Sequence, residues 1–289
     1  MHKLLIFAAL SSAPLFAGPI SSCKLPDDKS GYHLFNPVPQ NLMRELSTDR
    51  PDLTESPYTV DAGHFQIEMD LVSFTYDRYN PDRDNVRTND WAFGTMNFKL
   101  GISNNVDFQL VVPTYQRSRS HEYTSGAVSR SEGFGDLTFR TKINLWGNDG
   151  GNTAMALMPF VKFPTASDGL GNDEYEGGLI IPFGISLPNE WNLGLMAEID
   201  WIGDADGSGH HAEVITSITT SHAIVGDLSG YVEFYNLLSE DKGADWVASI
   251  GGGFTYAVND NLQLDAGVNI GLTRAADDWN PFVGVSWRF

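Results

Sequence analysis

The sequence has little positive charge, a single cysteine and no long hydrophobic run beyond its first residues. Its 289 residues hold 18 Lys and Arg against 37 Asp and Glu, a formal net charge of −19. Such a charge repels a phosphate backbone, so we expect no nucleic-acid partner. The only cysteine, Cys23, excludes an internal disulfide. No later stretch reaches the roughly 18 consecutive apolar residues of a transmembrane helix. Helix-like apolar periods are scarce, whereas 29 glycines and 12% aromatic residues favour strands.

The N-terminus has the composition of a secretory signal peptide. Lys3 precedes the apolar run Leu4–Leu10, and small residues follow it. Cleavage after Ala17 suits the small-residue rule. Alternatively, residues 20–23 (ISSC) resemble a bacterial lipobox, which would make Cys23 the lipidated first residue of the mature chain. We therefore predict a signal peptide over residues 1–22, with cleavage near 17 or 22, and export from the cytoplasm.

A polar segment with several prolines follows, at residues 23–62. Proline and other turn-forming residues interrupt regular structure, so we interpret this segment as a periplasmic lead-in. A short helix near residues 42–46 is the only regular element that we expect in it.

From Gly63 onward, polar and apolar residues alternate with a period of two. In the segment 262–272, Gln263, Asp265 and Asn269 fall on one face and the apolar residues on the other. This alternation is typical of a strand with one polar face. About twelve such segments occur, each near the ~9 to 11 residues that a tilted transmembrane strand needs. They lie near residues 63–76, 91–102, 106–116, 134–146, 153–164, 175–187, 191–202, 212–224, 228–238, 246–258, 262–273 and 279–289.

The connections between these segments alternate in length. Short connections rich in Asn, Asp and Gly alternate with longer polar stretches such as 117–133, as short periplasmic turns alternate with outer loops in bacterial barrels. We therefore predict an all-β fold, a transmembrane antiparallel up-and-down β-barrel of about twelve strands over residues 63–289. Four prolines conflict with this interpretation unless the strands are bulged or their ends are shifted, because proline cannot donate a ladder hydrogen bond. These are Pro113, Pro159, Pro164 and Pro182.

Aromatic residues mark the strand ends and the C-terminus. All seven tryptophans fall at or near the end of an expected strand, as expected for side chains at a membrane interface. In the last segment, Val283, Val285, Trp287 and Phe289 share one face. The terminal Phe289, with Trp287 two residues before it, resembles the signature by which the outer-membrane assembly machinery recognises its clients.

Charged residues fall on the faces opposite the apolar rows, and at mid-membrane depth they must face water or one another. We interpret them either as a polar pathway that selects solutes or as salt bridges that stabilise a plugged barrel. Tyr231 and Tyr235 flank Glu233 and could stack a planar solute. The candidate lumen-lining residues are Glu68, Asp70, Lys99, Asp107, Arg140, Lys142, Glu198, Asp200, Tyr231, Glu233, Tyr235 and Asp265.

Motifs for catalysis or metal binding are weak. His210 and His211 are adjacent, so in a strand they point to opposite faces, and no third ligand is fixed by spacing. The pair Ser221–His222 lacks a nucleophile motif around it, and His121 has no evident acid partner. We expect no catalytic residues, no metal and no cofactor.

Three stretches resemble a known family. These are residues 47–70, beginning STDRPDL, residues 133–147, beginning GFGDLTF, and residues 158–167, MPFVKFPTAS. They are similar to the meta-pathway phenol-degradation outer-membrane proteins, often called "transporter" β-barrels, over about residues 47–289. The resemblance implies a barrel that takes up small organic molecules, aromatic ones included. It carries no binding residues over to this chain.

Together these observations predict an outer-membrane channel or transporter of a Gram-negative-type bacterium. The expected cargo is a small organic molecule, aromatic or hydrophobic compounds included. The alternatives are a barrel enzyme acting on lipid or peptide and a structural barrel with a plugged lumen. The expected partners are outer-membrane lipid and lipopolysaccharide, the barrel assembly machinery and the small-molecule solute.

Overall fold

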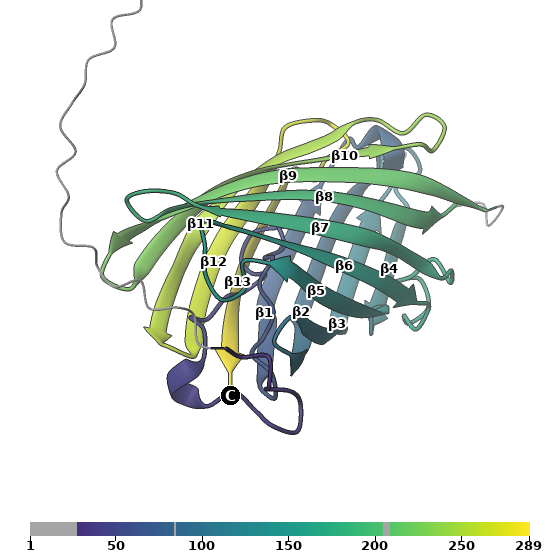
Figure 1. Cartoon of the computed structure of the whole chain (residues 1–289). Coiled ribbons are helices and arrows are strands. Elements are labelled where there is room, and N and C mark those ends of the chain that lie inside the picture. Colours follow the sequence, from purple (N-terminus) through teal and green to yellow (C-terminus); the bar gives the residue numbers. More distant parts are fainter. Residues whose placement is uncertain (1–27, 84, 205–208) are drawn as a thin grey trace, which may run out of the picture.

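The chain forms an antiparallel sheet rolled into a closed barrel (Figure 1). The computed structural model describes residues 28–83, 85–204 and 209–289, so the expected signal peptide and Cys23 lie outside it. Within these residues the helices are two short 3-10 turns, η1 (Gln40–Leu42) and η2 (Pro81–Arg83), and none is long and apolar enough to cross a membrane. The strands are β1 (Phe65–Asp77), β2 (Arg87–Ser103), β3 (Val106–His121), β4 (Val128–Gly133), β5 (Leu137–Trp146), β6 (Thr153–Phe163), β7 (Glu176–Ser186), β8 (Trp191–Gly203), β9 (His210–Val225), β10 (Leu228–Ser239), β11 (Val247–Asn259), β12 (Leu262–Gly271) and β13 (Trp279–Arg288).

The first and last strands close the barrel. β1 pairs with β13 on one side and with β2 on the other. At this seam the backbones of Phe65 and Phe289 exchange two hydrogen bonds of 3.0 and 2.9 Å, and their rings stack with centroids 5.9 Å apart. β4 and β5 pair with successive parts of β3, so the thirteen strands fill twelve positions. The predicted up-and-down barrel is confirmed.

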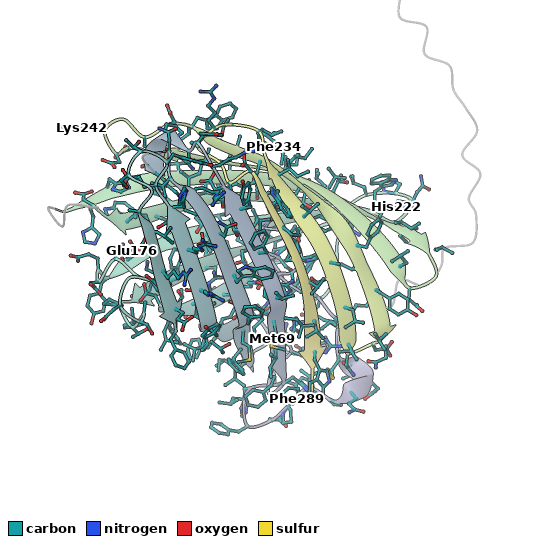
Figure 2. All side chains as sticks on the ribbon, turned by 180° about the vertical axis from the view of Figure 1, so that it is seen from behind. Met69, Glu176, His222, Phe234, Lys242 and Phe289 are labelled. Atoms are coloured by element: carbon teal, nitrogen blue, oxygen red, sulfur yellow. The ribbon has the colours of Figure 1, made fainter. Side chains whose placement is uncertain are left out.

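The two ends of the barrel differ in their connections. Tight turns, such as the one between β9 and β10, lie at the end that holds Phe289, which we call the turn end. Longer connections lie at the other end, the loop end. Phe289 and Lys242, which lies between β10 and β11, therefore occur at opposite ends of the molecule (Figure 2).

The wall contains one broken strand, at the GFGD stretch between β4 and β5. Asp136 Oδ1 accepts hydrogen bonds from the backbone N–H groups of Thr165 and of the residue after it, both at 2.8 Å. Ser167 Oγ accepts one from the Phe134 N–H at 3.0 Å, and the Ser167 N–H donates to the Phe134 carbonyl. Two of the stretches that carry the family resemblance, GFGD and PTAS, therefore hold each other and fasten the β6–β7 loop to the wall.

Replacing Asp136 with alanine is expected to release this loop without unfolding the barrel. The variant loses an acceptor of two backbone hydrogen bonds, and hydrogen bonds to a charged group contribute about 1.5–3 kcal/mol each. Hydrogen exchange of the β6–β7 loop should become faster, while exchange in the strands stays slow. Asp168→Ala, an exposed acid in the same loop, is the control. Unchanged exchange of the loop in Asp136→Ala would contradict this role.

The prolines inside strands lie where pairing is interrupted. β3 pairs with β5 up to Val111 and with β4 from Gln116 onward, and Pro113 lies between these two stretches. Pro159 lies in the part of β6 where pairing with β5 is interrupted. A residue without an N–H group is tolerated there, because no ladder bond requires it. Pro182 likewise lies where the pairing of β7 with β6 is interrupted, and Pro164 follows the end of β6. The conflict anticipated from the sequence is thus resolved by interrupted pairing and a shifted strand end.

The tryptophans form two bands on the outside of the barrel. All seven side chains are 41–54% exposed. Five lie at or next to a strand end, whereas Trp201 lies two residues before the end of β8 and Trp91 lies four residues inside β2. Bands of aromatic rings separated by an apolar belt are typical of barrels at the two interfaces of a membrane. The turn-end band holds Trp146, Trp191 and Trp287, and the loop-end band holds Trp91, Trp201, Trp246 and Trp279.

Two local predictions were wrong. The segment 117–133, expected to be a loop, continues β3 to His121 and contains β4. Its side chains are polar on both faces, as suits a hairpin that extends beyond the apolar belt, so it lacks the alternation used to find strands. The helix expected at residues 42–46 is also wrong, because η1 ends at Leu42 and Met43 is extended, with ψ of 145°.

Candidate functional site: the barrel lumen

The lead-in segment runs into the barrel from the turn end (Figure 1). We call its residues 47–61 the lumen segment, because their contacts reach inward-facing side chains from β1, β2, β3, β5, β10 and β12. These strands are far apart in sequence but surround one interior. The lumen therefore contains a polypeptide plug, and the charges on the wall contact it.

Asp49 lies at the centre of a buried charge cluster. It accepts hydrogen bonds from the ammonium groups of Lys99 and Lys142, the latter at 2.5 Å. Lys99 also pairs with Glu68, and Glu68 accepts the Asp49 N–H at 3.0 Å. All four side chains are at most 8% exposed. Charges buried to this degree need partners, so each member of the cluster depends on the others.

Arg50 joins two strands across the seam of the barrel. Its guanidinium donates to Asp70 at 2.6 Å, and to both carboxylate oxygens of Asp265 at 2.7 and 3.2 Å. A Cβ atom at residue 284 would lie 2.2 Å from Arg50 Nη2, so only glycine leaves room for the guanidinium there. The Arg50 Cζ atom also lies 5.7 Å from the centroid of the Phe282 ring.

Other inward-facing acids bind the backbone of the lumen segment. Glu233 accepts the Leu53 N–H at 2.9 Å and the Thr54 N–H at 2.7 Å, and Asp107 accepts the Val60 N–H at 2.9 Å. Backbone groups inside a barrel need such acceptors because a segment without a partner strand leaves its N–H groups unsatisfied. These two carboxylates accept the backbone hydrogen bonds that the carbonyl groups of a neighbouring strand would otherwise accept.

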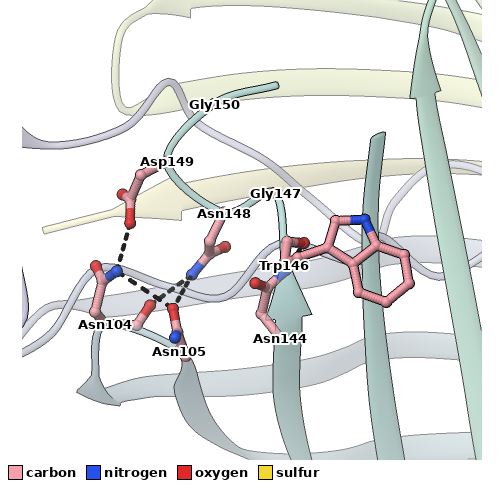
Figure 3. Close-up of a pocket in the computed structure, with 8 residues that line it drawn as sticks. All are labelled: Asn104, Asn105, Asn144, Trp146, Gly147, Asn148, Asp149 and Gly150. Atoms are coloured by element: carbon pink, nitrogen blue, oxygen red, sulfur yellow. Dashed lines mark hydrogen bonds between the residues drawn. The ribbon is translucent and has the colours of Figure 1, made fainter. Parts of the chain in front are cut away.

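Asparagines hold the lumen segment where it meets the turn end, and they line a pocket that is drawn in Figure 3. Asn148 accepts the Thr59 N–H at 3.1 Å and donates to Thr59 Oγ1 at 2.8 Å, while Asn144 donates to the Pro57 carbonyl at 2.9 Å. They line a polar pocket of about 290 Å³ together with Asn104, Asn105, Trp146, Gly147, Asp149 and Gly150. In sequence Asn148 is indistinguishable from an ordinary turn residue, so this anchoring was not predicted.

Eight of the twelve candidate lumen residues contact the lumen segment directly. Besides the residues described above, Arg140 donates to Glu55 at 2.6 Å. Tyr231 is buried on the inner wall, where a Cβ at Gly267 would lie 2.6 Å from its hydroxyl, and that hydroxyl has no hydrogen-bond partner among the described residues. The direct contacts are made by Glu68, Asp70, Lys99, Asp107, Arg140, Lys142, Glu233 and Asp265.

One part of the lumen wall is apolar. Met158, Ile180, Met196 and Ile215 point inward from β6, β7, β8 and β9, are at most 7% exposed, and form one packed cluster. Phe160, Tyr235 and Leu237 pack against it. We call these seven residues the apolar cluster. Sequence reasoning missed it because β6 and β7 are apolar on both faces, and the search for lumen residues followed polar rows.

The histidines do not assemble a catalytic or metal site in the described part of the chain. Ser221 and His222 alternate across β9, and the His222 ring packs against Trp191 on the outside, with centroids 4.5 Å apart. His210 Nε2 lies 2.8 Å from the Tyr175 carbonyl. His211 lies between two carboxylates at the loop end. No group of three or more metal-ligating side chains occurs among the described residues.

Comparisons with known proteins agree with the fold. A family model described as "Putative MetA-pathway of phenol degradation" matches residues 48–289. An outer membrane channel from Pseudomonas putida F1 superposes with a TM-score of 0.64 at 12% identity, covering 84% of this chain and all of that one (100%). The NanC porin (10% identity, 77% and 98% covered, TM-score 0.47) and the translocator domain of the autotransporter NalP from Neisseria meningitidis (12% identity, 78% and 88% covered, TM-score 0.47) are more distant. No curated protein sequence matches the chain significantly.

Proposed function

The chain belongs to this phenol-degradation family, and we propose that it is an outer-membrane channel for small organic molecules, hydrophobic and aromatic ones included. The observation that carries the proposal is the apolar cluster on the inner wall of the barrel. The interior of a water-filled pore is ordinarily polar. Apolar side chains there lower the free energy of an apolar solute, because each square ångström removed from water contributes about 25 cal/mol.

In this proposal the channel is closed at rest because the lumen segment is docked inside the barrel. Its ion pairs reach strands on several sides of the barrel, so the pathway for larger solutes is closed while it is docked. Passage requires that it shift within the lumen. The Pseudomonas putida neighbour is an outer membrane channel, which supports the same class of function.

The surroundings of the barrel follow from its outer surface. Exposed apolar side chains lie between the two tryptophan bands, for example Val232, Phe254 and Leu264. They would face the acyl chains of the outer membrane, with lipopolysaccharide around the loop end. The outward-facing Trp287 and Phe289, both 53% exposed, would be read by the barrel assembly machinery during insertion.

Uptake of an apolar fluorescent probe tests the proposed function. Intact outer membranes largely exclude 1-N-phenylnaphthylamine, which fluoresces once it reaches the lipid beyond. Cells that express the protein should show a faster rise in fluorescence than cells that lack it. Met196→Glu should slow that rise, because it places a charge in the apolar cluster.

Asn192→Asp is the matched control, since it adds a charge to the inward-facing row of the same strand but at its exposed turn end. Heat-modifiable migration in gel electrophoresis verifies that each variant is folded, and Met196→Gln replaces Met196→Glu if the latter does not fold. Equal uptake with and without the protein would contradict the proposal. That outcome would favour the second candidate, a structural barrel with a plugged lumen, which the buried ion pairs of Asp49 and Arg50 support.

A further inference from the structure

Four arginines lie together on the outer wall of the barrel near the loop end, where β2, β3 and β4 are neighbours (Figure 1). Residues opposite each other in adjacent strands share a face, and so do residues two or four positions apart in one strand. Trp91 of the loop-end band lies opposite Arg117, and Arg119 lies opposite Arg130. Arg87 lies four residues before Trp91 in β2. We call these four arginines, which share the outward face of Trp91, the arginine patch.

The arginine patch lies at the depth of the lipid headgroups. On the membrane side of Trp91, the outward rings of Phe93 and Tyr115 have centroids 6.2 Å apart and continue the apolar surface. Arg117 is level with Trp91, and Arg87 lies four residues further from the apolar belt. Four residues of a strand span about 13 Å, whereas a headgroup layer is about 5 to 7 Å thick on each side of a membrane. The patch therefore begins inside the headgroup layer and extends past its outer surface.

The patch is positive in a protein that is strongly negative. It holds four of the 18 Lys and Arg residues of the chain. Among the described residues its one salt bridge is a 3.9 Å contact between Arg117 and Glu132, whose side chains are 52% and 64% exposed, and an exposed pair of this kind contributes little. The patch thus carries an excess of positive charge that the protein itself does not neutralise.

Two features of the patch are unfavourable without an anion. Arg119 and Arg130 lie directly opposite each other in the register, and like charges in this arrangement destabilise a sheet. The buried Nε atom of Arg87 has no hydrogen-bond partner among the described residues, and such a donor lowers stability. A multivalent anion on the patch would remove the repulsion and supply the missing acceptor.

The side chains of the patch suit phosphate in particular. All four are arginine, whose planar guanidinium donates two parallel hydrogen bonds to phosphate oxygens, whereas lysine acts as a point charge. The outer leaflet around the loop end presents phosphates on the glucosamine headgroup of lipopolysaccharide. Its phosphates lie at the same depth as the patch, and its acyl chains lie at the depth of the aromatic surface next to it.

We propose that the arginine patch is a binding site for the phosphorylated glucosamine headgroup of a lipopolysaccharide molecule. Arg119 and Arg130 bind one phosphate between them, and the other two arginines of the patch bind on either side. The acyl chains of the same molecule lie against Trp91 and Phe93, which are 41% and 40% exposed. The inference goes beyond the proposed function, because a lipid held on the outer wall does not depend on what passes through the lumen.

Native mass spectrometry of the purified full-length protein, released from a non-ionic detergent, tests the site. Each lipid is titrated in the presence of EDTA, so that divalent cations do not bridge it to acidic loops. The probes are diphosphorylated lipid A, the same lipid after removal of its phosphates, phosphatidylglycerol and inorganic phosphate. We expect diphosphorylated lipid A to bind about tenfold or more tightly than the other two lipids, because charge-assisted hydrogen bonds are the stronger class. Inorganic phosphate, which lacks the acyl chains, should not bind measurably.

The double variant Arg119→Gln/Arg130→Gln should weaken binding of diphosphorylated lipid A about 25-fold, since each basic residue near an anionic membrane surface contributes about fivefold. Lys242→Gln/Arg274→Gln is the matched control, because it removes the same charge from exposed positions in two other loop-end connections. It should bind as the wild type does. Glu132→Gln should bind severalfold more tightly, because it removes the acid that competes with the lipid for the patch.

Heat-modifiable migration verifies that each variant is folded, and the gain expected in Glu132→Gln keeps the test decisive if the double variant does not fold. Equal affinity for lipid A with and without its phosphates overturns the inference. Equal affinity for phosphatidylglycerol overturns it as well, because the patch would then attract any anionic lipid. Equal weakening in the double variant and in its matched control would show attraction by net charge alone and would also overturn it.

Discussion

Replacing Arg50 with methionine is expected to raise the single-channel conductance severalfold. Arg50 is the one side chain of the lumen segment that binds carboxylates of both β1 and β12, with distances of 2.6 and 2.7 Å. Removing one partner from a buried ion pair typically destabilises by about 3–5 kcal/mol, because the other charges stay buried and unpaired. We expect this loss to destabilise the docking of the lumen segment and not the barrel, because the backbone hydrogen bonds between the wall strands do not involve Arg50. Planar-bilayer recording measures the result.

Arg78→Met is the matched control. Arg78 forms a 3.2 Å pair with Asp278, but the side chains are 54% and 35% exposed, and exposed pairs contribute little. Its conductance should equal that of the wild type. Arg50→Lys should give an intermediate conductance, because an ammonium group cannot bind a carboxylate through two parallel bonds. Wild-type conductance in Arg50→Met would show that the plug does not depend on this anchor.

Deleting Phe289 is expected to remove most of the folded protein from the outer membrane. Its backbone forms the two hydrogen bonds that join the end of β13 to Phe65, and its ring stacks on the Phe65 ring. It is also the last of the outward-facing residues of β13 that the assembly machinery would recognise. Heat-modifiable migration of outer-membrane fractions gives the folded amount. Phe254→Ala, at an equally exposed aromatic residue within β11 (57% against 53%), is the control and should insert normally.

Folding in vitro separates the two roles of Phe289. If the residue acts as a recognition signal, Phe289→Ala should fold into lipid vesicles as the wild type does, while its insertion in cells falls. If the residue mainly closes the barrel, folding fails in both settings. Normal insertion of the deletion variant in cells would contradict both roles.

The strands were largely predictable because most of them alternate polar residues that face the lumen with apolar residues that face the lipid. For β12, expected near 262–273, the structure gives Leu262–Gly271, and for β10, expected near 228–238, it gives Leu228–Ser239. The prediction failed where that alternation ends. β4 lies in a hairpin with polar residues on both faces, and the break at GFGD depends on hydrogen bonds to a loop about 30 residues further along the chain.

The candidate site was predictable in its residues but not in its partners. Alternation placed Glu68, Lys99 and Asp265 on the polar face, yet nothing in their spacing showed that Asp49 and Arg50 would bind them. The apolar cluster was missed for the opposite reason. Met158 and Ile180 lie in strands with apolar residues on both faces, so the sequence did not distinguish the inward face from the outward face.

By itself the sequence determined the barrel, its strand number and its closing residue, Phe289. These follow from local features of the sequence. One is the two-residue period of polar and apolar residues, and the other is the position of the aromatic residues. Tertiary structure alone decided what fills the lumen. The lumen segment has no periodic pattern, and its docking depends on single charges from strands up to 215 residues away, as between Arg50 and Asp265. Such pairings arise only when the barrel closes and brings distant strands around one interior.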